Sequence, residues 1–229
     1  MSFLLRVRVP DRPGALGALA TALGFAGADI LSVDVVERGD GVAVDDLVVD
    51  LPRGALPDSL ITAAELVDGV HVDSVRPYTG VLDTHRELEL IDHVAATIGD
   101  RLQVLVDGIP RVLRVGWATV LHSGARSAGR GVESGTYRVV GSPSAPETQL
   151  GDVPWWPLRA PAALDGGDSW VPQAWQDMDT TVALAPLGGP DQALVIGRPG
   201  GPEFRPSEVA RLGHMAGIVA TVLRRAELG

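Results

Sequence analysis

Residues 11–16 read DRPGAL, and they separate an alternating apolar stretch from a stretch rich in alanine and leucine. Gly14 permits a sharp turn of the backbone, and the first N–H groups of a helix that starts here are unpaired at the positive end of its dipole. A ligand carboxylate fits such a turn. The same residues also make a good strand-to-helix connection without any ligand, because Pro13 presets φ and Asp11 can act as a cap. The residues alone leave both interpretations open.

The elements that would position this turn follow from hydrophobic periodicity. Between residues 3 and 9 the odd positions are apolar and positions 6 and 8 are arginine, which predicts a half-buried strand. Apolar spacings of three and four then predict a helix that ends near Gly27. The expected remainder is a hairpin with strands over 29–37 and 42–51, a short helix closed near Gly69, and a strand over 70–76. This βαββαβ order predicts a ferredoxin-like fold, with both helices on one face of a four-stranded antiparallel sheet.

The stretch from residue 3 to residue 77 resembles the ACT domain, whose usual opening is a strand, DRPG, a Leu-rich helix and a second strand that begins like Gly27-Ala28-Asp29-Ile30. The resemblance implies a regulatory module that binds a free amino acid at an interface between two such domains. The family often has Asn where this chain has Asp29, and a carboxylate there favours the ammonium group of the ligand. The resemblance assigns ligand contacts to Asp11, Arg12, Pro13, Gly14, Ala15, Leu16, Asp29 and Ile30.

From about residue 85 onward the pattern indicates a separate α+β domain. Two amphipathic helical pieces come first, and Gly108-Ile109-Pro110 is expected to kink or divide them. A buried strand follows over 116–122, then a loop over 123–135, a hairpin made by VALAPL and ALVIG, and a last helix that contains residues 209–223. We expect the terminal helices to pack on one face of a central sheet.

This order, with Phe204 ahead of an acidic, Leu-rich last helix, resembles a GAF domain. The resemblance implies a small-molecule sensor with a pocket over the sheet and dimerisation through the terminal helices. Aromatic residues that can line such a pocket or lid are Tyr137, Trp155, Trp156, Trp170 and Trp175. Because Trp side chains are more often packed in a core or an interface, packing is the favoured interpretation.

Composition excludes several kinds of chemistry. The sequence has no Cys, Lys or Asn, so it lacks thiolate zinc ligands, a Schiff-base or P-loop lysine, and the signatures of cyclic-nucleotide-binding and bilin-binding GAF domains. A net charge of −10 without clustered Arg argues against nucleic acid and anionic membranes as partners. His71 and Asp73 share a strand face but are only two ligands, and no His pairs with Ser169. We therefore expect no metal, no cofactor and no catalytic serine.

These observations predict a non-enzymatic regulatory protein with an ACT-like domain over residues 1–80 and a GAF-like domain over residues 85–229. The expected assembly is a homodimer that relays amino acid binding through its terminal helices to an unknown protein partner. Arg6 and Arg8 interrupt any N-terminal signal core, and no apolar run approaches the ~20 residues of a membrane helix, so the cytoplasm is the expected location. The alternatives are a ligand-free dimerisation scaffold and, third, an enzyme subunit.

Overall fold

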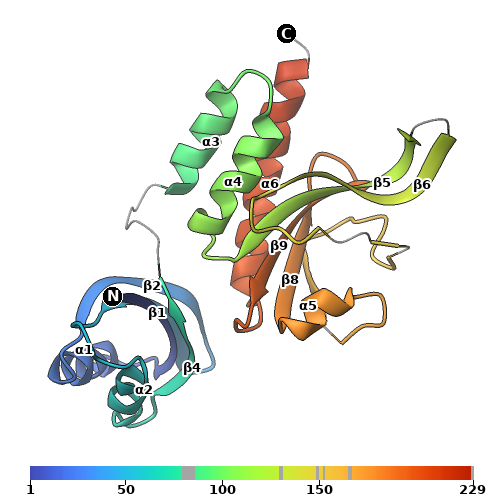
Figure 1. Ribbon diagram of the computed structural model, residues 1–229. Helices are drawn as coiled ribbons and strands as arrows, with labels where there is room; N and C mark the ends of the chain where they lie inside the picture. The colour runs from blue at the N-terminus through green and yellow to red at the C-terminus, as the bar shows by residue number, and fades with distance from the viewer. Residues whose placement is uncertain (79–85, 129–130, 148–149, 152, 165–166, 228–229) are drawn as a thin grey trace. The chain divides into compact units, whose positions relative to one another are not determined.

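The chain forms two compact units, Met1–Asp83 and Thr84–Gly229 (Figure 1). A computed structural model describes residues 1–78, 86–128, 131–147, 150–151, 153–164 and 167–227. The domain boundary predicted near residue 80 lies outside these described residues. Each unit has its own sheet and its own hydrophobic core, which are the attributes of a separate domain.

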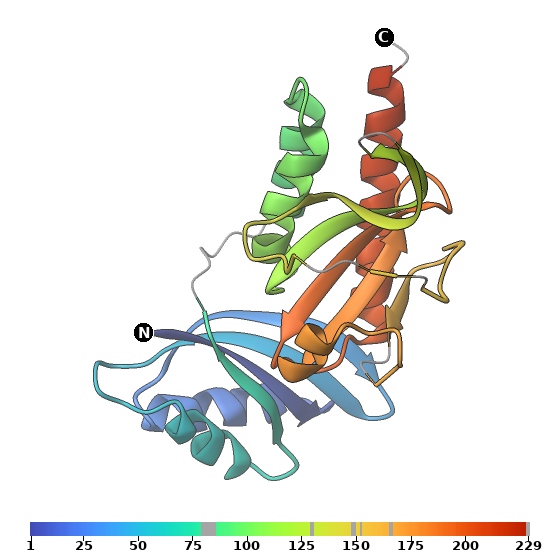
Figure 2. The ribbon, with the colours of Figure 1, turned by 45° about the vertical axis from the view of Figure 1, so that its right-hand side comes forward.

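The first unit is a four-stranded antiparallel sheet with two helices on one face (Figures 1 and 2). Its elements are β1 (Ser2–Pro10), α1 (Ala15–Phe25), β2 (Asp29–Gly39), β3 (Val42–Asp50), α2 (Asp58–Glu65) and β4 (His71–Pro77). The strands lie in the order β2-β3-β1-β4, so β1 and β3 are central and β2 is an edge. This is the ferredoxin-like βαββαβ arrangement that the periodicity predicts.

The two faces of this sheet are chemically different. Alternate residues of β1 and β3, such as Leu5 and Leu47, point at the helices and are fully buried with Leu19 of α1 and Leu60 of α2. On the opposite face, the guanidinium of Arg6 donates to both carboxylate oxygens of Asp46, at 2.7 Å from Nε and 2.8 Å from Nη2. The residues of β1 alternate in type as the sequence predicts, but the strand is not half-buried: Leu4 and Arg6 on the second face are 3% and 1% exposed, and Arg6 is buried in a bidentate ion pair.

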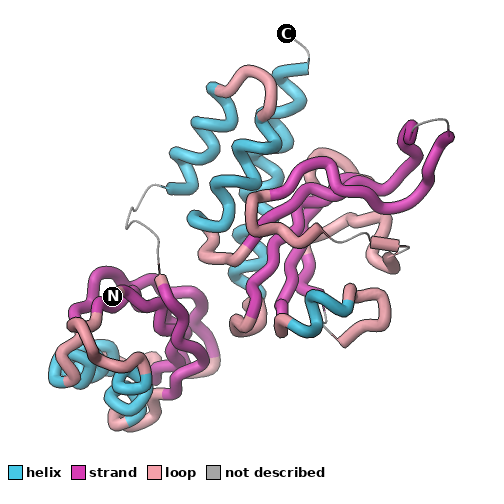
Figure 3. The backbone as a smooth tube through the Cα atoms, in the orientation of Figure 1, coloured by secondary structure: helices cyan, strands magenta, loops and turns pink. Residues whose placement is uncertain are grey.

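The second unit is a five-stranded antiparallel sheet in the order β6-β5-β9-β8-β7. Its elements are α3 (Arg86–Ala96), α4 (Arg101–Val112), β5 (Trp117–Ala128), β6 (Gly131–Gly141), β7 (Ala162–Leu164), α5 (Gln173–Asp177), β8 (Thr180–Pro186), β9 (Gln192–Pro199) and α6 (Pro206–Glu227). The helices α4 and α6 pack against one face of the sheet, and α3 packs on these two helices (Figure 3). Buried apolar side chains of those helices and of β5, β8 and β9 form one core there.

Two expectations for this unit are wrong. The first helical stretch does not divide at Gly108-Ile109-Pro110. Pro110 lies inside α4, close to its end, and the helix loses only the backbone hydrogen bond that an N–H at this position would donate. The division falls at Gly99, whose φ of 101° is a conformation that glycine adopts readily. The loop predicted over 123–135 is instead mostly the paired arms of β5 and β6, since cross-strand pairing overrides its Gly- and Ser-rich composition.

The start of α6 is fixed by a buried arginine. Arg198 of β9 is 1% exposed, lies over the ring of Phe204 at 4.2 Å and donates to Glu208 at 2.6 Å. Glu208 also accepts the N–H of Arg205, the residue before the helix, as in a capping box. Within the described ranges, no helix combines the length and the apolar character that crossing a membrane requires.

Candidate functional site

The turn between β1 and α1 leaves N–H groups free at the start of the helix. Gly14 has φ 90° and ψ −15°, a left-handed conformation, and no side chain caps α1. The N–H of Ala15 donates to the carbonyl of Arg12 at 3.3 Å, so it is already used inside the turn. In the described structure the N–H groups of Leu16 and Gly17 have no partner. These two groups, at the positive end of the helix dipole, are the ones that can bind an anion.

Asp45 is a buried carboxylate at the same end of the sheet. It pairs with Val7 of β1 and therefore points toward the helix face, although the surrounding inward positions are apolar. The residue is 4% exposed, and its Oδ1 atom has no hydrogen-bond partner among the described residues. Burial raises the pKa of Asp45, the neighbouring charge of Arg38 lowers it, and the charges of Asp46 and Asp11 raise it further. Asp45 thus lies close to Asp11 of the turn, and Arg38 compensates its charge only in part.

Arg38 completes the charged cluster at this end of the sheet. It lies on β2 opposite Ala43, and its Nε is 3.9 Å from Oδ1 of Asp11. Carboxylates, one guanidinium and free helix N–H groups therefore converge near the end of β1. A molecule that carries both an ammonium and a carboxylate has a partner here for each charge. We refer to Asp11, Gly14, Leu16, Arg38 and Asp45 as the turn cluster.

The sequence contains a signal for Asp45 that motif reasoning missed. In VAVDDLVVD, residues 42–50, two aspartates are adjacent in a strand whose neighbours are apolar. Since successive side chains point to opposite faces, one of the two must point inward. Strand alternation alone therefore places one of the two carboxylates in the core, and such a residue is a functional candidate.

Comparison with known proteins identifies the fold around this cluster. Residues 3–65 match the family model of the ACT domain. The first unit contains an ACT domain. The comparison with curated proteins found no match.

Two solved structures show distant similarity. One is a formyltetrahydrofolate deformylase from Pseudomonas putida KT2440, with 11% identity and a TM-score of 0.28; the match covers 41% of this chain and only 37% of the deformylase. The other is an unknown protein from Galdieria sulphuraria, with 13% identity and a TM-score of 0.32, matched over 99% of this chain and 91% of that one.

In the ACT domain, two groups of residues that the sequence assigns to one ligand site lie at opposite ends of the sheet. Asp29 pairs with Asp50, which pairs with Ser2, whereas the turn follows Pro10 at the other end of β1. Eight residues of strand, roughly 25 Å, lie between these ends. Ile30 packs against the domain core rather than lining the turn. Within one chain, therefore, Asp29 cannot take the ammonium of a ligand whose carboxylate lies at Leu16.

The tryptophans expected to line a pocket of the second unit pack against one another. Trp175 is 3% exposed and lies against Trp117, with ring centroids 5.1 Å apart, so it fills the core on the sheet face opposite α6. Trp155 contacts Trp156 at 4.4 Å and Trp170 at 6.3 Å, and all three are partly buried against that core. Tyr137 instead lies edge-on to His122 at 5.4 Å, apart from this group.

The strand-face pair His71 and Asp73 lies on β4, where an arginine contacts the carboxylate. Asp73 accepts a hydrogen bond from Nε of Arg8 at 2.8 Å, so its carboxylate has a cation beside it. In the described part of the chain, no three His, Cys, Asp or Glu residues are grouped as a metal site requires.

Proposed function

We propose that the chain is a non-enzymatic regulatory protein whose ACT domain binds a free α-amino acid at the turn cluster. The observation that carries this proposal is the buried Asp45 carboxylate, whose Oδ1 has no partner, beside a helix start with unpaired N–H groups. The ligand carboxylate docks on the N–H groups of Leu16 and Gly17, with Arg38 near it. Its ammonium group compensates the charge of Asp45, which Arg38 compensates only in part.

A homodimer would bring Asp29 to the same cluster. β2 is an edge strand, and its Val33 and Val35 are 37% and 50% exposed. If two copies pair along β2 about a twofold axis, the two strands run antiparallel, and Asp29 of one copy lies beside the Gly39 end of the other. The turn is at that end, because Gly39, Val42 and Pro10 are level in the sheet. Two copies would therefore bring Asp29 close to the turn, which a single copy cannot do.

The role of the second unit is also a proposal. Its helices α3, α4 and α6 on one face of an antiparallel sheet fit the GAF-like arrangement that the sequence pattern suggests. We expect it to carry the output: an amino acid that favours one dimer arrangement changes what a partner protein binds, within a coupling of ~1 to 3 kcal/mol.

Titration calorimetry of the full chain with each common amino acid at millimolar concentration tests the proposal. At least one should bind, and its α-hydroxy acid analogue, which lacks the ammonium, should bind at least about tenfold more weakly. Asp45→Asn should weaken binding by about tenfold or more, since a charge-assisted hydrogen bond contributes ~1.5 to 3 kcal/mol. Asp92→Asn, on the exposed face of α3, is the matched control and should bind as wild type does.

The outcomes separate the alternatives. If no amino acid binds and the protein is a stable dimer, the scaffold interpretation replaces this one. If an amino acid binds but Asp45→Asn leaves its affinity unchanged, the ligand lies elsewhere. If Asp29→Ala weakens binding only where the protein is dimeric, the site is shared between two copies.

A further inference from the structure

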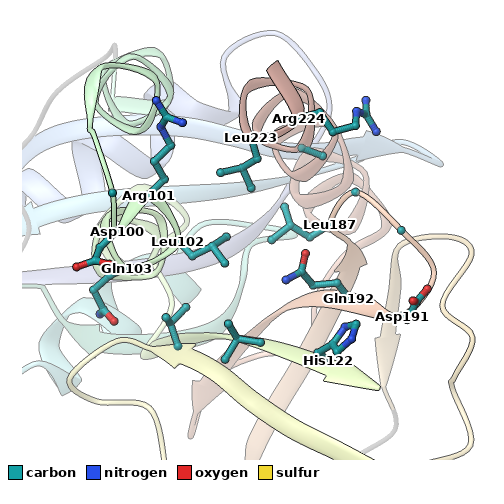
Figure 4. Close-up of a pocket in the computed structure, with 16 residues that line it drawn as sticks. Asp100, Arg101, Leu102, Gln103, His122, Leu187, Asp191, Gln192, Leu223 and Arg224 are labelled. Atoms are coloured by element: carbon teal, nitrogen blue, oxygen red, sulfur yellow. The ribbon is translucent and has the colours of Figure 1, made fainter. Parts of the chain in front are cut away.

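A pocket of about 670 Å³ lies in the second unit, on the sheet face that carries α4 and α6. It is surrounded by the start of α4, the last turns of α6, the middle of β5, the end of β6 and the β8–β9 hairpin. Figure 4 shows side chains from the two helices and from the strands and hairpin around one space. The volume is within the range of small-molecule sites. The tryptophan cluster lies on the other face of the sheet, so this pocket is distinct from it.

One part of the pocket wall is apolar. Leu102 of α4, Leu223 of α6 and Leu187 of the hairpin face it, together with Val140 and Ala220. In Figure 4 the side chains of Leu102 and Leu223 point from their helices toward the middle. A ligand with an apolar body would remove this surface from water.

Gln192 and His122 are the polar groups that remain open to a ligand. They are directly paired across β5 and β9, so their side chains lie side by side on the pocket face. Neither side chain makes a hydrogen bond within the described part of the chain. In Figure 4 the amide of Gln192 points toward Leu102, across the pocket. An unpaired carboxamide offers a donor and an acceptor next to each other.

The other polar groups around the pocket are occupied or balanced. The amide nitrogen of Gln103 donates to Asp107 at 2.9 Å and to the carbonyl of Gly141 at 3.1 Å, and Nε of Arg101 donates to Thr97 at 2.7 Å. The charged lining residues are two acids and two arginines, Asp100, Asp191, Arg101 and Arg224. Their formal charges cancel, so the pocket does not select an ion.

We propose that this pocket binds a small uncharged molecule with an apolar body and an amide edge. The body contacts Leu102, Leu187 and Leu223, and the amide pairs with the carboxamide of Gln192 through two hydrogen bonds, with His122 beside it. This proposal is independent of the proposed amino acid site in the first unit. It sits between α4 and α6, so its occupant would contact the last helix directly.

Benzamide is the probe for this site, and benzoate is its charged analogue of the same shape. Saturation-transfer NMR and titration calorimetry on the full chain should show benzamide binding with a Kd of about 1 mM or tighter, as a good small fragment gives. Gln192→Leu should weaken benzamide at least about fivefold, because it removes both hydrogen bonds and retains the size of the side chain. Gln173→Leu, the same substitution on the exposed face of α5, should leave binding unchanged. Benzoate should bind at least about tenfold more weakly than benzamide, since nothing compensates its charge.

Thermal unfolding of both variants keeps the test interpretable, because a Gln192→Leu protein that melts like wild type has lost a contact and not its fold. Absence of benzamide binding by the wild type overturns the proposal. Equal binding by Gln192→Leu shows that benzamide lies elsewhere and also overturns it. Benzoate binding as tightly as benzamide overturns the assignment to an uncharged ligand. Asp45→Asn should not affect benzamide, which separates this result from the amino acid test.

Discussion

At the scale of single residues, the turn cluster combines features that cost stability. Asp45 has a raised pKa because burial disfavours its charged form. Gly14 holds a positive φ of 90°, where nothing lies within 4 Å of the position that a Cβ would take. The conformation rather than crowding therefore selects glycine. Neither feature is required for packing, which is typical of residues retained for binding.

Asp45→Asn should make the protein more stable at pH 7, by about 1 kcal/mol, because it removes a buried charge that Arg38 compensates only in part. The folded-state pKa of Asp45 lies above its unfolded value, so wild-type stability falls as pH rises through the interval between the two. As the pH falls toward the unfolded-state value of 3.8, the carboxyl is protonated first in the folded state and then increasingly in the unfolded state, so the advantage of the Asn variant should shrink. Urea unfolding of both proteins at pH 7 and pH 4 measures this. A less stable Asn variant at pH 7 would indicate that Asp45 has a compensating partner.

Gly14→Val should lower the free energy of unfolding by about 1 to 2 kcal/mol, the cost of a left-handed conformation for an L residue. Gly14→Asn should cost less, because Asn tolerates that conformation. Denaturant unfolding measures the free energy of unfolding of both variants, which differ only in the residue at this position. Equal losses would mean that backbone strain does not explain the glycine.

At the scale of elements, the pairing of β5 with β9 depends on one glycine. Trp117 is directly opposite Gly197, and a Cβ on Gly197 would lie 2.0 Å from the indole ring. The indole therefore lies across the neighbouring strand and reaches Trp175 of α5. A side chain at 197 would displace it and disturb the core opposite α6.

Gly197→Ala should destabilise the protein by about 1 to 3 kcal/mol through overpacking. In a Trp117→Leu background the same change should cost much less, since the ring that it meets is gone. A double-mutant cycle by thermal unfolding gives the interaction energy. Additive effects would refute a direct conflict between the two side chains.

At the scale of the whole molecule, two units with separate cores share one chain. The ACT domain exposes an edge strand whose inner-face residues Val33 and Val35 are apolar. An exposed edge of this kind is a ready template for pairing with a second chain. Its symmetric use by two copies is the simplest explanation that also completes the proposed ligand site.

Val33→Glu should convert a wild-type dimer to monomer, because the twofold axis brings two buried like charges together. Light scattering at micromolar concentration measures the mass. Leu66→Glu is the control on α2: Leu66 is 80% exposed and away from β2, so this variant should remain dimeric. A wild-type protein that is already a monomer would remove the basis for the shared site.

The sequence by itself determined the βαββαβ order and the ACT assignment, because strand alternation, helical spacing and the DRPG turn are local patterns. Tertiary structure decided what depends on register. It placed Asp29 at the opposite end of the sheet from the turn, put Asp45 under the helix face, and paired the Gly- and Ser-rich segment after residue 122 into strands. It also placed Gln192 and His122, which are 70 residues apart in the sequence, side by side in one pocket. Such contacts depend on how distant segments pair, and a local pattern carries no information about that pairing.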